Sequence, residues 1–98
     1  MTKAEFNGLY DSLCYGHDAE LRINGNIVFA EWNGEKIELF HIVDNTGKRI
    51  CDISDGNKFD TVKMLFSKCI FGKTLNDNHN EIDILDIEWG QVNEMRKC

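Results

Sequence analysis

The chain has 98 residues, a formal net charge of −6 at pH 7 and a hydrophobic content of 42%. This length suffices for one hydrophobic core, so we expect a single domain over residues 1–98 and exclude a disordered chain. No apolar run approaches the ~20 residues that cross a bilayer, and the amino terminus lacks the apolar stretch of a secretory signal. The sequence therefore predicts a cytoplasmic protein without a membrane partner, whose four cysteines stay reduced.

The first predicted element is a helix over residues 3–13. Thr2 and Glu5 have the spacing of a capping box, in which each side chain accepts a hydrogen bond from the other residue's backbone. Gly16 supplies a stop signal. Four apolar side chains recur at helical spacing and predict one buried stripe: Phe6, Leu9, Tyr10 and Leu13.

Three turn signals follow and predict a four-stranded antiparallel meander. Two are the dipeptides Asn24-Gly25 and Asn33-Gly34, which favour two-residue hairpin turns because both residues adopt positive φ at low cost. The third is Asn45-Thr46-Gly47. The strands that these turns separate cover residues 19–23, 27–32, 36–43 and 48–53.

Turn length fixes which residues face each other. Two-residue turns predict that Leu21 lies opposite Val28, and that Ala30 lies opposite Ile37. One face of the sheet is then apolar and the other half charged, as in a sheet with one solvated side. The apolar face collects Leu21, Ile23, Val28, Ala30, Trp32, Ile37, Leu39, His41 and Val43, and the charged face collects Glu20, Arg22, Ile27, Phe29, Glu31, Lys36, Glu38, Phe40 and Ile42.

A three-residue loop is predicted for the last hairpin. It pairs Val43 with Arg49 and sets His41 opposite Cys51 on the buried face. A slip by one residue would turn Asp52 into the core, so we expect the three-residue loop.

A second helix is predicted from Lys58, after the polar start signal Asp55-Gly56-Asn57. Its predicted buried stripe consists of Phe59, Val62, Leu65, Phe66 and Cys69. Two helices on one face of a four-stranded sheet make an α+β domain. The segment from Gly72 onward contains a polar loop over residues 76–80 and then an acidic C-terminal segment, for which a short strand and an irregular docked segment are both open.

The acidic segment is the main functional indication. Between Thr74 and Met95 there are six acidic residues and no Lys or Arg. Such a segment repels nucleic acid and attracts a protein with a basic surface. We predict a partner-binding set formed by Glu81, Asp83, Asp86 and Glu88, with Trp89 as an apolar anchor. The alternative is a solvated acidic tail that only aids solubility.

Catalytic patterns are not present, so the sequence predicts that the protein is not an enzyme. Gly72-Lys73-Thr74 resembles the end of a phosphate-binding loop, but Ser67 stands where that loop needs its first glycine. The carboxylates of the acidic segment lack the fixed separation that glycosidase-type chemistry requires.

Two groups of residues are candidates for zinc binding. Cys14 and His17 have ligand spacing but lack a second pair. The stronger candidate combines His41 and Cys51, predicted to be cross-strand neighbours, with Cys69 at the end of the second helix. The alternative is a core histidine with small apolar cysteines.

The order of motifs resembles a family of small acidic proteins from phages and mobile elements of Firmicutes. The resemblance rests on Gly16-His17-Asp18, the Asn-Gly hairpins, Ile70-Phe71-Gly72-Lys73-Thr74-Leu75 and Ile87-Glu88-Trp89. Leu75 replaces the aromatic residue of the family pattern, and the loop after it is richer in asparagine.

This resemblance implies an anti-CRISPR function, that is, inhibition of a type II CRISPR nuclease. Such a nuclease offers positively charged channels and DNA-reading arginines to an acidic protein. The alternative function is a structural or zinc-stabilised accessory domain of a phage or mobile element, without inhibitory activity.

Overall fold

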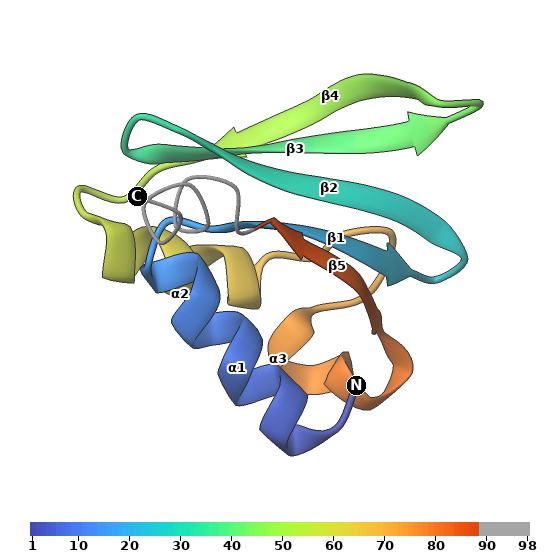
Figure 1. The fold of residues 1–98 in the computed structure, drawn as a ribbon, viewed down its shortest axis with the longest axis horizontal. Coiled ribbons are helices and arrows are strands. Elements are labelled where there is room, and N and C mark those ends of the chain that lie inside the picture. Colours follow the sequence, from blue (N-terminus) through green and yellow to red (C-terminus); the bar gives the residue numbers. More distant parts are fainter. Residues whose placement is uncertain (89–98) are drawn as a thin grey trace, which may run out of the picture.

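The computed structural model describes residues 1–88 and has two layers, a five-stranded antiparallel sheet and a layer of helices on one of its faces (Figure 1). The strand order is β4-β3-β2-β1-β5, so the meander keeps its chain order and the last strand joins beside the first. The elements are α1 (Lys3–Cys14), β1 (Asp18–Ile23), β2 (Asn26–Asn33), β3 (Lys36–Val43), β4 (Thr46–Ile53), α2 (Lys58–Ser67), α3 (Leu75–Asn78), the 3-10 helix η1 (His79–Glu81) and β5 (Asp83–Glu88). The predicted α+β class is confirmed.

The two main helices begin where the capping signals predict. The Thr2 hydroxyl accepts a hydrogen bond from the Glu5 N–H, and the Glu5 carboxylate accepts one from the Thr2 N–H, which completes the capping box. Asn57 caps α2 by accepting from the Asp60 N–H. Neither helix is long and apolar enough to cross a membrane, and the same holds for the other helices within residues 1–88.

The first hairpin has the predicted register, but the second does not. Leu21 lies opposite Val28, as expected. In the second hairpin Ala30 lies opposite Leu39 and not Ile37, because the turn consists of Gly34 and Glu35 and begins on the positive φ of Gly34, +67°. The error shifts the pairing by two positions along β3. A shift of two leaves the same side chains on the same face, so the predicted division of side chains between the two faces holds for β1–β3. Of the predicted apolar face, however, Val43 is 52% exposed, and Trp32 and His41 are only partly buried.

The predicted register of the third hairpin is also wrong. Its turn has two residues, Asp44 and Asn45, both with positive φ, and His41 lies opposite Lys48. A bulge after Arg49 then inserts Ile50 as an extra residue, so that Cys51 pairs with Leu39 and Ile53 with Ile37. The bulge returns Ile53 to the buried face and keeps Asp52 exposed. His41 and Cys51 are therefore not cross-strand neighbours.

The buried stripe of α2 differs from the prediction at both ends. Val62, Leu65 and Phe66 are buried, and Thr61 joins them. Phe59 is 63% exposed and Cys69 is exposed. Phe59 lies in the first turn of the helix.

The segment after Gly72 forms helix and strand where a polar loop was expected. Thr74 caps α3 by accepting a hydrogen bond from the Asp77 N–H, so the Asn-rich stretch is helical. The chain then enters β5, which pairs antiparallel with β1. This is the strand alternative of the sequence prediction, and it makes the sheet five-stranded.

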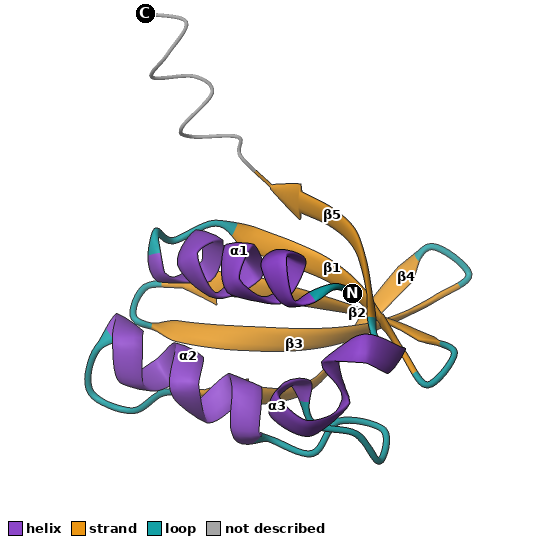
Figure 2. Ribbon diagram, turned by 90° about the horizontal axis from the view of Figure 1, so that it is seen from below, coloured by secondary structure: helices purple, strands orange, loops and turns teal. Residues whose placement is uncertain are grey.

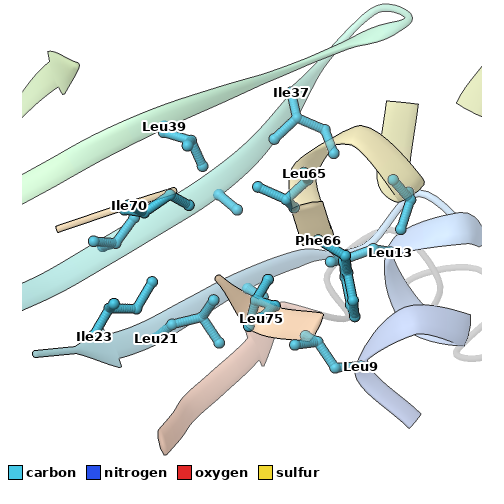
Figure 3. Packing of buried hydrophobic residues seen from close by; sticks show 14 of the residues in the cluster. Leu9, Leu13, Leu21, Ile23, Ile37, Leu39, Leu65, Phe66, Ile70 and Leu75 are labelled. Carbon is cyan, nitrogen blue, oxygen red and sulfur yellow. The ribbon is translucent and has the colours of Figure 1, made fainter. Parts of the chain in front are cut away.

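The hydrophobic core lies between the sheet and the helices (Figure 3). Leu9 and Leu13 of α1 and Leu65 and Phe66 of α2 reach it from the helical side. The sheet contributes side chains from the predicted apolar face, and Leu75 and Ile82 close the end near α3. Figure 2 shows that all helices cover the same face, which leaves the opposite face of the sheet uncovered by residues 1–88.

Candidate protein-binding site

The uncovered side of the sheet, which we call the open sheet face, carries an apolar centre. Phe29 of β2 lies opposite Phe40 of β3, and Ile27 lies opposite Ile42. All four side chains are partly exposed, because their neighbours along each strand turn toward the helices. Gly47 of β4 lies beside them, and a Cβ atom there would come within 3.3 Å of the Ile42 Cδ1 atom. The centre is thus a shallow patch of large apolar side chains.

Charged residues surround this centre, and each cation among them is paired. Arg22 contacts Asp83 at 3.5 Å, Lys36 contacts Asp52 at 3.3 Å, and Arg49 contacts Glu38 at 2.9 Å. The hydrogen bonds from Arg49 and Asn33 lower the pKa of Glu38.

Three carboxylates of the open sheet face, Glu20, Glu31 and Asp86, have no ion-pair partner among residues 1–88. Glu20 lies directly opposite Asp86 in the β1–β5 pair and opposite Phe29 in the β1–β2 pair. Glu31 follows two residues after Phe29 on the same face and lies opposite Glu38. Like charges directly opposite each other destabilise a sheet. This acidic cluster around Phe29 therefore lowers stability and leaves negative charge facing outward.

Asp18, at the start of β1, adds a partly buried carboxylate next to this cluster. Its Oδ1 atom accepts a hydrogen bond from the Trp32 N–H at 2.8 Å. Burial raises the pKa of Asp18, although the Trp32 hydrogen bond and nearby His17 oppose that effect. In the β1–β5 ladder, the backbone of Asp18 lies opposite that of Glu88.

The predicted partner-binding residues have different surroundings. Glu81 pairs with Lys73 at 3.3 Å, a contact that lowers the Glu81 pKa, and Asp83 pairs with Arg22. Asp86 is exposed, and its carboxylate accepts a hydrogen bond from the Ile87 N–H. Glu88 is the last residue of β5, and Trp89 lies outside the described residues.

Sequence reasoning put Glu20 and Glu31 on the solvated face but did not include them in the site. The strand pattern alone shows that they face solvent. What brings them together with Asp86 is the docking of β5 beside β1, across more than sixty residues of sequence, and no local signal indicates that pairing.

The three predicted zinc ligands are only partly brought together. Cys51 and Cys69 both line a hollow of about 280 Å³, together with Lys68 and Phe71. His41 lies against the ring of Phe71 instead, with the ring centroids 4.8 Å apart. Burial raises the pKa of the Cys51 thiol, which disfavours the thiolate that zinc binds. Within residues 1–88 there is no group of three His, Cys, Asp or Glu side chains that could hold a metal ion. The zinc site stays a prediction.

Comparison with known proteins finds no matching family model, curated protein or solved structure.

Proposed function

We propose that the protein binds a protein partner with a basic surface through its open sheet face, and that it thereby blocks the partner from handling nucleic acid. The observation that carries this proposal is the acidic cluster of Glu20, Glu31 and Asp86 around the partly exposed Phe29. An apolar centre with charges at its rim is the usual composition of a protein-binding patch.

The energetics favour a binding role over a role in folding. Directly opposed carboxylates cost stability, and the three cations of the face are already paired with other acids. A basic partner would offset this repulsion when it binds, because its Lys and Arg side chains approach carboxylates that lack a counter-charge. Local features that lower stability without a compensating contact are typical of functional sites.

A type II CRISPR nuclease is the partner that the resemblance to phage proteins favours. Such nucleases hold nucleic acid in positively charged channels and read DNA with arginines. The open sheet face would occupy part of such a channel, with carboxylates at the positions of phosphates and Phe29 as an apolar anchor. The net charge of −6 supports fast, salt-dependent association.

The test is inhibition of target-DNA cleavage by a panel of type II nucleases loaded with guide RNA. We expect inhibition by the unmodified protein, and loss of inhibition by the triple variant Glu20→Gln, Glu31→Gln, Asp86→Asn. The association rate should fall as salt rises, because exposed charges are screened beyond about 8–10 Å at physiological salt.

A matched control variant distinguishes the effect of where the negative charges lie from the effect of the total net charge. Glu35, Asp44 and Asp55 are exposed and unpaired within the described part of the chain, and they lie in turns and loops at the ends of the strands. Their replacement by Gln, Asn and Asn removes the same number of negative charges as the first triple variant and should leave inhibition intact. Equal loss in both variants would show that net charge alone acts. A lack of inhibition by the unmodified protein across the panel would remove the nuclease assignment.

A further inference from the structure

A second surface lies on the helical side of the molecule, in a groove between the end of α1 and the start of α2. The groove has a volume of about 460 Å³ and is lined by Tyr10, Asp11, Cys14, Tyr15 and Phe59. Three of these five side chains are aromatic. Tyr15 is 81% exposed and Phe59 is 63% exposed, which is unusual for such large side chains outside a contact surface.

Two of these rings, Tyr10 and Tyr15, pack against aromatic rings that do not line the groove. Tyr15 stacks on His17 with ring centroids 6.0 Å apart and an interplanar angle of 14°. Tyr10 packs edge-on against the buried Phe66 ring, at 5.2 Å. Tyr10 and Tyr15 therefore do not have to be ordered when a ligand binds, which lowers the entropic cost of binding.

The charge at the groove is negative. Asp11 lines it and has no ion-pair partner among residues 1–88. Burial raises the pKa of the Tyr10 hydroxyl most and the Cys14 thiol adds to this effect, while Asp60, the neighbour of Phe59 in α2, and Asp11 contribute less. Lys58 does not line the groove: its Nζ atom lies 5.5 Å from the centre of the Trp32 ring and close to Gly16.

We propose that this groove binds an arginine side chain from a protein partner, with the guanidinium stacked between Tyr15 and Phe59 and paired with Asp11. A guanidinium is the cation that combines stacking on aromatic faces with a bidentate bond to a carboxylate. The groove offers both interactions, and no Lys or Arg among residues 1–88 lines it. A second copy of this chain is a poor occupant, because a net charge of −6 on each molecule opposes association.

This inference does not depend on the proposed function, because the groove is built from helical residues and the open sheet face lies on the other side of the sheet (Figure 2). Each surface can be tested alone.

The experiment is an NMR titration of the full chain with N-acetyl-arginine amide. The expected result is a set of saturable shifts at the amides of Tyr15 and Phe59. N-acetyl-citrulline amide, which has the same shape without the charge, should produce no such shifts. Equal shifts from the citrulline compound would overturn the proposal, and so would shifts confined to the acidic cluster on the open sheet face.

Two variants test the assigned contacts. Phe59→Ala and Asp11→Asn should each weaken binding by about two- to fivefold, the range of one exposed cation–π contact or one exposed ion pair. The matched controls are Met64→Ala, an exposed apolar residue on α2 outside the groove, and Asp55→Asn. Both controls should bind as the unmodified chain does. Binding that survives Phe59→Ala and Asp11→Asn unchanged would overturn the proposal, as would self-association of the chain through these residues in the absence of the probe.

Discussion

Replacing Asp86 with Asn should stabilise the protein. Asp86 lies opposite Glu20, beside the irregularity that shifts the β1–β5 register between Glu20 and Leu21, and opposed side chains in a regular antiparallel pair have Cβ atoms about 4.5–5.5 Å apart. Two unit charges roughly 6 Å apart in water repel each other by about 0.7 kcal/mol. The Asn oxygen can still accept the hydrogen bond from the Ile87 N–H, so the variant loses charge and little else.

A gain of this size should be measurable. For a domain of this length, about 0.7 kcal/mol corresponds to a rise in Tm of about 3–6 °C. The assay is thermal and urea unfolding followed by circular dichroism at about 10 mM salt, where the Debye length is about 30 Å. At about 1 M salt, where this length falls to about 3 Å, most of the gain should disappear.

Asp83 provides the matched control on the same strand. It is exposed like Asp86, but it contacts Arg22 at 3.5 Å. Asp83→Asn should therefore leave stability unchanged or lower it by up to about 1 kcal/mol, the usual range of an exposed ion pair. If Asp86→Asn is no more stable than Asp83→Asn at low salt, the acidic cluster does not carry the repulsion that the proposed function requires.

Three further predictions concern pH and metal. Asp18→Asn should be at least as stable as the unmodified chain at pH 7, because burial raises the Asp18 pKa and the Asn oxygen still accepts a hydrogen bond from the Trp32 N–H. In urea unfolding, the difference in stability should disappear below about pH 4, where Asp18 is protonated in both the folded and the unfolded chain. Arg49→Gln should lower stability at pH 7, since Arg49 holds the Glu38 pKa down, and the two proteins should converge in the same assay as pH falls through the lowered Glu38 pKa, below about 4. For zinc, elemental analysis of protein purified without a histidine tag should find less than about a tenth of an equivalent if the three predicted ligands are packing residues only. A stoichiometric content together with loss of stability on chelation would establish a metal site, for which residues 1–88 show no group of three ligating side chains.

Local signals in the sequence were enough for the helix starts and for the faces of the meander. The Thr2–Glu5 capping box and the Asn57 cap act over three residues, so they can be read without knowledge of the rest of the chain. The alternation of side chains along a strand has a period of two. It assigned Leu21 and Val28 to the core, where both are buried, and Glu20 and Glu31 to the opposite face, where both are partly exposed.

The same alternation does not determine the pairing register of the second and third hairpins. In the second hairpin a shift of two positions keeps every side chain on its face, so burial does not distinguish Ala30 opposite Ile37 from Ala30 opposite Leu39. The backbone geometry of Gly34 decides between them. In the third hairpin, the bulge at Ile50 allows a two-residue turn and a buried Ile53 to occur together. A regular ladder without a bulge does not allow this combination.

The candidate site was decided by tertiary structure. The sequence determined that residues 81–88 are acidic, and it left open whether they form a strand. Pairing of β5 with β1 places Asp86 opposite Glu20, and the packing of both helices on one face leaves Phe29 partly exposed on the other. Both outcomes depend on contacts between segments far apart in the chain. The free energy that stabilises these contacts comes from the burial of apolar side chains such as Leu75 and Ile82 in the shared core. No local window of the sequence contains both sides of such a contact.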